Sequence, residues 1–199
     1  MDDRHLSFLD HLPLTRRAVL FAQERHGKQR RTSDGASIVL HLLEVASLLD
    51  RSGYPDHVVA AAVLHDVLED TDTARAELDS RFGPEVGGLV ACVSDRPTIE
   101  DEEARKDDVR QRVRSVGGEA AVVYAADKVS KVRELRWLMA SHPGDPEIEV
   151  RLSRYRKSLE MLDEQIPGSR LVALLRFELE ALAELPPDPV SDMPASVGC

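Results

Sequence analysis

The chain reads VVAAAVLHDVLED over residues 58–70, and this stretch decides how it folds. The first seven residues are apolar on every side, a pattern typical of a helix buried at the centre of a protein. Four ionisable residues follow with no glycine or proline between them, so the helix is predicted to continue through them: His65, Asp66, Glu69 and Asp70. At about 100° per residue, their side chains share one arc of that helix, beside a segment that should be buried.

Carboxylates in such a place need a partner. Without one they are costly to bury or take up protons, and a bound cation would resolve this conflict. The His65-Asp66 pair alone is weak support for a metal site, because the composition yields about 0.7 such dipeptides by chance. The competing interpretation is a helix end with solvated charges. In that interpretation, a turn at Asp72-Thr73 follows the helix end. In either interpretation, Asp72-Thr73 can start the next helix, which is expected to end near Phe82-Gly83.

Two further residues interrupt apolar helical stretches elsewhere in the chain. His41 lies between residues 38–40 and Leu42-Leu43, and Asp127 follows the apolar run 120–126. A lone histidine in such a place is more often a hydrogen-bonded core residue than a metal ligand, whereas a buried aspartate needs a partner. With the His65-Asp66 pair they make a set of two imidazoles and two carboxylates, which suits Mn(II), Fe(II) or Zn(II).

Helical patterns dominate the rest of the chain. An apolar stripe at helical spacing runs through Leu152, Tyr155, Leu159 and Leu162, after an expected N-cap at Asp145. Strict alternation of apolar and polar residues is scarce, and aromatic residues make up only 4%, so a sheet is poorly supported. The sequence predicts an all-α protein: a single domain of eight to ten helices over residues 5–184. A proline-rich tail over residues 185–199 is predicted to be disordered.

Composition excludes several classes of function. The 199 residues include 26 Lys+Arg and 36 Asp+Glu, a formal net charge of −10, which argues against a general nucleic-acid or anionic-membrane binder. No apolar run exceeds seven residues, and the first ten residues do not resemble a signal peptide. Cys92 and Cys199 lack metal-ligand spacing, and a cytoplasmic location is expected.

Several short motifs identify a resemblance when they are taken in order. They are Phe21-Ala22 with His26-Gly27-Lys28-Gln29-Arg30-Arg31, His41 with Leu43-Glu44-Val45-Ala46, the stretch AAVLHDVLEDT at 61–71, Phe82-Gly83-Pro84-Glu85-Val86 with Leu89-Val90, and Ala126-Asp127-Lys128 with Arg133-Glu134-Leu135. They resemble motifs of the HD-domain metal-dependent phosphohydrolases. The match is closest to the alarmone-hydrolase branch, which contains the hydrolase domain of Rel/SpoT proteins and the small alarmone hydrolases such as the metazoan SpoT homologue.

The resemblance implies an HD-type helical bundle that uses Mn(II), or another divalent metal, to remove the 3′-pyrophosphate from guanosine tetra- or pentaphosphate. The metal ligands that it implies are His41, His65, Asp66 and Asp127. Glu69 and Asp70 would orient and deprotonate the attacking water. The substrate-binding positions that it implies are Arg31, Thr32, Ser33, Lys128 and Lys131. The expected partner is a small nucleotide, with no nucleic acid and no membrane involved; Arg105-Lys106 resembles a further basic pair.

Three departures from the family pattern leave the substrate open. The usual Pro-Tyr-Ile before the first metal histidine is replaced by Ile38-Val39-Leu40, which removes a tyrosine near the substrate pocket. Thr32 stands where many relatives have lysine, and Lys131 stands where an asparagine contacts the nucleotide. An alternative is therefore a hydrolase of another nucleotide phosphate, for example the 2′-phosphate of NADPH. A second alternative is a regulatory module that binds metal without catalysis.

Overall fold

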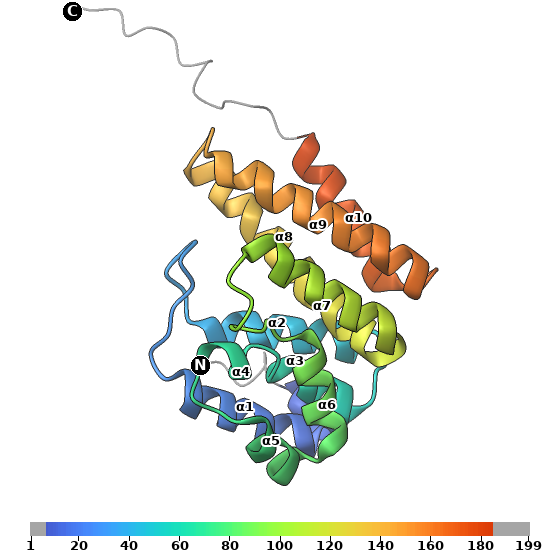
Figure 1. Cartoon of the computed structure of the whole chain (residues 1–199). Coiled ribbons are helices and arrows are strands. Elements are labelled where there is room, and N and C mark those ends of the chain that lie inside the picture. The colour runs from blue at the N-terminus through green and yellow to red at the C-terminus, as the bar shows by residue number, and fades with distance from the viewer. Residues whose placement is uncertain (1–6, 185–199) are drawn as a thin grey trace, which may run out of the picture.

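The computed structural model describes residues 7–184, and it is helical throughout this range (Figure 1). Ten α-helices and one 3-10 helix occur between residues 7 and 184: η2 Ser7–His11, α1 Pro13–His26, α2 Ile38–Arg51, α3 Asp56–Val63, α4 Val67–Asp70, α5 Arg75–Phe82, α6 Pro84–Val93, α7 Glu102–Val116, α8 Gly118–Ser141, α9 Pro146–Gln165 and α10 Arg170–Ala183. The prediction of an all-α protein with eight to ten α-helices is therefore confirmed for this range. The predicted tail, 185–199, lies outside the described residues, as do residues 5 and 6 of the predicted domain.

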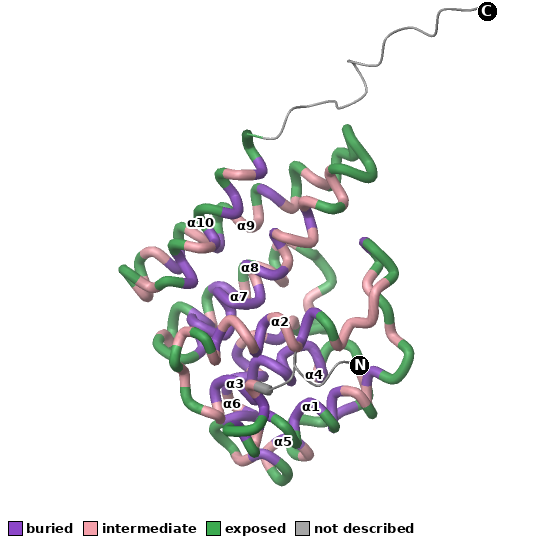
Figure 2. Tube along the Cα trace, turned by 180° about the vertical axis from the view of Figure 1, so that it is seen from behind, coloured by how far each residue is buried: buried purple, intermediate pink, exposed green. Residues whose placement is uncertain are grey.

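Helix α3 forms the centre of the fold, as its uniformly apolar sequence predicts. Every residue from Val58 to Leu64 is at most 1% exposed. The helix packs against α1, α2, α6 and α8 (Figure 2). A helix that is surrounded on all sides has no solvent face, which is why the segment carries no polar residue.

The predicted continuation of this helix through His65 and Asp66 is wrong. Helix α3 ends at Val63, and α4 begins only at Val67. Leu64, the C-cap of α3, has φ/ψ values of −98°/0°, outside the α-helical range, whereas Asp66, at −91°/−6°, is the αR N-cap of α4. Carbonyl oxygens left free at the end of α3 need partners. The imidazole Nδ1 of His65 bonds to the Ala62 carbonyl at 2.7 Å, and the Ser94 hydroxyl donates to the His65 carbonyl at 3.1 Å.

A second boundary also differs from the prediction, because α5 begins at Arg75 with Ala74 as its N-cap rather than at Asp72-Thr73. The hydroxyl of Thr71 donates to the Val67 carbonyl at 2.6 Å, and it is 2.8 Å from the Thr73 hydroxyl. These bonds tie the threonines to the end of α4 instead of the start of α5. At α9 the prediction is confirmed, since the Asp145 side chain accepts from the Glu147 amide.

Helix α8 links the two layers of the molecule. It packs against α2, α3, α6 and α7 on one side and against α9 and α10 on the other. Figure 1 shows α9 and α10 stacked together, far from α1 and α5. Asp127 lies near the middle of α8, at the level of the buried centre. Among the described residues, no helix has both the length and the apolar character needed to cross a membrane.

Candidate metal centre

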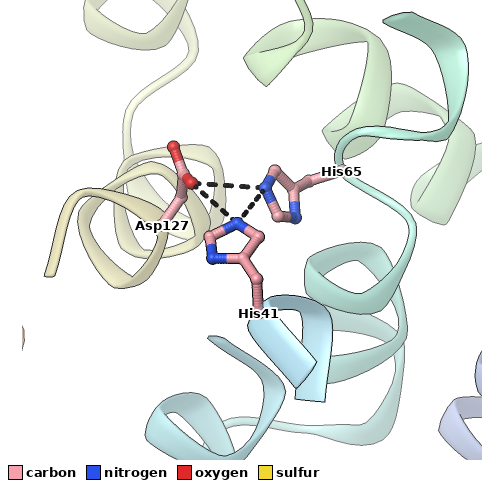
Figure 3. Close-up of side chains that lie close together, drawn as sticks. All are labelled: His41, His65 and Asp127. Atoms are coloured by element: carbon pink, nitrogen blue, oxygen red, sulfur yellow. Dashed lines mark hydrogen bonds and ion pairs between the residues drawn. The ribbon is translucent and has the colours of Figure 1, made fainter. Parts of the chain in front are cut away.

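Three buried side chains from three different helical segments converge at one point. His41 comes from α2, His65 from the turn after α3, and Asp127 from α8 (Figure 3). The two Nε2 atoms are 3.2 Å apart, and Asp127 Oδ1 lies 3.3 Å from each of them. The three residues are at most 4% exposed, so the cluster lies inside the protein.

Hydrogen bonds fix the orientation of both imidazole rings. His65 donates from Nδ1 to the Ala62 carbonyl. The Ser130 hydroxyl donates to Glu44 Oε2 at 2.6 Å, so its oxygen accepts from Nδ1–H of His41 at 2.9 Å. With the proton on Nδ1, the Nε2 atom of a neutral imidazole carries a lone pair, and both lone pairs then face the centre. Metal-ligating histidines are commonly held in this way by a partner on the other ring nitrogen.

Asp66, the fourth predicted ligand, lies beside the cluster of His41, His65 and Asp127. Its Oδ1 is 3.0 Å from His65 Nε2, and its Oδ2 is 3.6 Å from His41 Nε2. Burial opposes ionisation of this carboxyl, but the charges of His65 and Lys131 outweigh burial and hold its pKa far below the usual value. Burial would likewise lower the pKa of His65, yet Asp66 and Asp127 raise it to about 10.

Two lysines of α8 approach Asp127. Lys128 donates to its Oδ2 at 2.6 Å and lies over the Tyr124 ring, 4.3 Å from the ring centroid. Lys131 Nζ lies 3.1 Å from Oδ1 of Asp127 and 3.8 Å from Oδ1 of Asp66. Although burial raises the pKa of a carboxyl, the two lysines and His65 keep the pKa of Asp127 well below its usual value.

The donor set fits a divalent cation. Ligand atoms held about 2.1 Å from one ion at cis or tetrahedral angles are about 3.0–3.4 Å apart. The two imidazole nitrogens and Asp127 Oδ1 are separated by 3.2, 3.3 and 3.3 Å. Among the described residues, Asp127 Oδ1 is also a buried oxygen without a hydrogen-bond partner, which a metal would satisfy. Mixed nitrogen and oxygen ligands suit Mn(II), Fe(II) or Zn(II).

Of the two predicted catalytic carboxylates, only Glu69 lines the inner cavity; Asp70 lines neither cavity. Glu69 Oε1 accepts from the Asp95 amide at 2.5 Å. Burial of the carboxyl and the negative charge of Asp66 raise the pKa of Glu69, and the same two causes raise the pKa of Asp70. Both groups are therefore better proton acceptors near neutral pH than ordinary carboxylates.

Two connected cavities lead away from the centre. The inner cavity, of about 20 Å³, is lined by His65, Asp66, Glu69 and Asp127 among others. The outer cavity, of about 230 Å³, is formed by α7, α8 and α9, and six cationic side chains line it: Lys106, Arg110, Lys128, Lys131, Arg151 and Arg154. Both cavities share Lys106, Lys128 and Lys131. The outer cavity is also lined by Glu102, Glu134 and Glu147, and Glu147 pairs with Arg151 and Arg154.

The structure places the predicted substrate-binding residues in two groups. Lys128 and Lys131 lie beside the metal centre, but Arg31, Thr32 and Ser33 are in the loop before α2 and do not line either cavity. Arg31 pairs with Asp34. The Ser33 carbonyl accepts from Trp137 Nε1 at 3.2 Å.

Sequence reasoning missed most of the outer cavity. Arg151, Arg154 and Tyr155 share one face of α9, and Tyr155 belongs to the apolar stripe seen in the sequence. It is half-buried, packs against the core and also lines the cavity. The spacing of the three residues puts them on one helix face, but nothing in the sequence indicates which element that face meets.

Comparisons with known proteins agree with this architecture. An HD domain family model matches residues 18–149. A guanosine-3′,5′-bis(diphosphate) 3′-pyrophosphohydrolase from Aquifex aeolicus is 33% identical over 127 residues, which are 63% of this chain but 18% of that protein. The mouse pyrophosphohydrolase MESH1 is 39% identical over 121 residues, 59% of this chain and 67% of that protein.

A solved structure has the same fold over nearly its whole length. It is that of a metazoan orthologue of SpoT that hydrolyses ppGpp, and it superposes with a TM-score of 0.77 at 25% identity over 86% of this chain and 97% of that one. The family match covers residues on α1 to α9, including all four candidate ligands. The chain therefore belongs to the HD-domain family, in the branch that contains the metazoan SpoT homologues.

Proposed function

We propose that this protein is a metal-dependent phosphohydrolase that removes the 3′-pyrophosphate from guanosine 3′,5′-bis(diphosphate), with Mn(II) as its metal. The observation that carries the proposal is the triangle of His41 Nε2, His65 Nε2 and Asp127 Oδ1, with sides of 3.2 to 3.3 Å. Asp66 is proposed as the fourth ligand. The names of the Aquifex and mouse relatives support the substrate.

The metal would lower the pKa of a bound water and neutralise charge on the phosphoryl oxygens. Glu69 is proposed to receive the proton from that water. Its Oε1 accepts from the Asp95 amide, and Glu69 lines the inner cavity together with His65, Asp66 and Asp127. Asp70 is proposed to support Glu69 in orienting the water, because its carboxyl lies under the influence of the same Asp66 charge.

The charge of the site supports an anionic substrate. With a divalent metal bound, the three lysines that line the inner cavity (Lys106, Lys128 and Lys131) would leave one positive charge in excess of its four carboxylates (Asp66, Glu69, Asp95 and Asp127). We propose that the scissile phosphate lies against these lysines and that the remainder of the nucleotide enters the outer cavity. Phosphoryl transfer needs mainly positioning and charge stabilisation, which this arrangement of fixed cations provides. Arg31, Thr32 and Ser33 line neither cavity, so they are proposed to contact the nucleotide only where it extends beyond the outer cavity towards the loop before α2.

A second candidate substrate is another nucleotide phosphate, such as the 2′-phosphate of NADPH. The observation that favours it is the position of Lys131, whose ammonium reaches the metal centre itself. A single phosphate group bound there would be neutralised by the ammonium groups of Lys128 and Lys131, so the site does not require a second phosphoryl group on the substrate. The two substrates differ in the leaving group, pyrophosphate or inorganic phosphate, and this difference separates them experimentally.

The test is to deplete the purified protein of metal and add back one divalent ion at a time. Guanosine 3′,5′-bis(diphosphate) and NADPH are then supplied separately, with release of pyrophosphate and phosphate measured. We expect pyrophosphate release that depends on Mn(II). If bound Mn(II) is demonstrated and neither product forms, the proposed hydrolase activity is wrong.

A matched pair of variants tells catalysis from metal binding. Glu69→Gln keeps the size of the side chain and the acceptor for the Asp95 amide, so it should bind Mn(II) and lose turnover. Asp127→Asn alters a ligand, and both metal and turnover should be lost. If Glu69→Gln retains full turnover, Glu69 does not receive the proton. If the unmodified protein and both variants show no turnover although metal is bound, a metal-binding module without catalysis is the better interpretation.

A further inference from the structure

The side chain of Lys131 is partly exposed to solvent, and its ammonium group contacts the buried carboxylates of the candidate metal centre. Its side chain is 33% exposed and lines both cavities, while Nζ lies 3.1 Å from Asp127 Oδ1, whose side chain is only 6% exposed. The same Nζ is 3.8 Å from Asp66 Oδ1. Lys128, by contrast, contacts the other oxygen of Asp127 and stacks on Tyr124.

The oxygen beside Lys131 is the one that the metal would use. Asp127 Oδ1 faces both imidazoles at 3.3 Å, and it is a buried atom without a hydrogen-bond partner among the described residues. The ammonium of Lys131 and a divalent ion would therefore share Asp127 Oδ1 and Asp66 Oδ1. Two cations that share carboxylate oxygens in a buried site repel each other strongly, because the effective dielectric constant there is low.

We propose that Lys131 is a built-in competitor for the metal, which weakens divalent-ion binding in the free protein and makes it depend on an anion. The proposal rests on the metal site of the proposed function. When a phosphate binds beside Lys131, where the outer cavity adjoins the inner one, it provides negative charge to both the metal and the ammonium. Metal and phosphate then strengthen each other's binding by the same factor, as linkage requires. Lys131 would thus favour a loaded metal only when substrate is present.

The experiment measures Mn(II) affinity of the metal-depleted full chain by the electron paramagnetic resonance signal of free Mn(II), with and without inorganic phosphate. The variants are Lys131→Gln, which removes the charge, and Lys131→Arg, which keeps it. Lys106→Gln is the matched control, because Lys106 lines the same two cavities but pairs with Asp95 at 2.6 Å instead of the ligands. Circular dichroism establishes that each variant is folded.

Without phosphate, we expect Lys131→Gln to bind Mn(II) at least about tenfold more tightly than the unmodified protein. Lys131→Arg should bind no more tightly, and Lys106→Gln should change the affinity less than about threefold. Phosphate should strengthen Mn(II) binding in the unmodified protein and do so less in Lys131→Gln.

Several results would overturn the inference. They are an unchanged or weaker affinity in Lys131→Gln, an equal gain in Lys131→Arg, or an equal gain in Lys106→Gln. If neither the unmodified protein nor Lys131→Gln binds Mn(II), the proposed metal site itself fails. If only Lys131→Gln binds it, the competition is supported and the metal dependence proposed for the unmodified protein is wrong.

Discussion

Ser130 holds His41 in the orientation that a metal ligand needs, and removing its hydroxyl should weaken metal binding. In Ser130→Ala, Nδ1–H of His41 loses its acceptor at 2.9 Å, and Glu44 loses its donor at 2.6 Å. The His41 side chain is only 2% exposed, so bulk water cannot readily replace the hydroxyl. Loss of such a partner behind a metal-ligating histidine typically costs about 10- to 100-fold in affinity, or about 1.4–2.8 kcal/mol.

Isothermal titration of the metal-depleted protein with Mn(II) measures this change. Ser158→Ala is the matched control, because Ser158 and Ser130 are both 1% exposed and both hydroxyls make a hydrogen bond to a side chain. The partner of Ser158 is Tyr124 at 3.0 Å, and Ser158 itself makes no hydrogen bond to a candidate ligand or to a residue that holds one. Both variants should lose about 1–3 kcal/mol of unfolding free energy, because each leaves buried polar groups without partners.

Only Ser130→Ala should lose metal affinity. A Kd for Mn(II) that stays within twofold of the unmodified protein would refute the positioning role of Ser130. An equal loss in Ser158→Ala would show that the effect reflects general destabilisation. The Glu44 carboxylate is also held by Arg133 at 2.8 Å, so Glu44→Gln should show a smaller loss than Ser130→Ala.

Three further predictions follow from other contacts. The pKa of His65 is raised to about 10 in the metal-free protein, so below that pH a metal must displace the proton on this imidazole. Mn(II) affinity should therefore rise about tenfold per pH unit between about pH 7 and 9, and an affinity that does not change with pH would contradict this. Asp56 accepts from the amides of Leu14 and Thr15 at 2.8 Å and caps α1 from another helix. Asp56→Ala should therefore lower the free energy of unfolding by about 2–4 kcal/mol, seen as a lower urea midpoint with an unchanged m-value. An unaltered midpoint would exclude a stabilising role for the cap. Glu69→Gln should lower kcat at least about 100-fold at saturating Mn(II), whereas a change in KM alone would assign Glu69 to binding.

Local sequence signals predicted the helical segments well where the chain carries its own start and stop signals. Asp145 caps α9 as its sequence indicates, because an aspartate side chain can reach the amide of a residue just after it. At α1 the capping group is Asp56, some 40 residues away in sequence. A cap supplied by another helix leaves no local pattern, so it could not be predicted.

The prediction of one unbroken helix across α3 and α4 failed for a similar reason. Residues 64–66 contain neither glycine nor proline, and local signals favour an unbroken helix. At the break, the hydroxyl of Ser94, the residue after α6, lies 3.1 Å from the His65 carbonyl and 2.8 Å from the Val90 carbonyl. That tertiary contact stabilises a turn which the sequence around His65 does not specify.

By itself, the sequence determined the chemistry of the candidate site: which residue types carry nitrogen and oxygen ligands, and that apolar surroundings would force them to find a cation. Only the tertiary structure decided the geometry. It brought His41, His65 and Asp127 within 3.3 Å of one another across up to 86 residues of chain. It also placed the Lys131 ammonium beside Asp127 Oδ1, the oxygen that faces both imidazoles, and brought cationic side chains of α7, α8 and α9 to one cavity. Helical periodicity fixes the face on which a side chain lies, whereas what that face meets depends on how the helices pack.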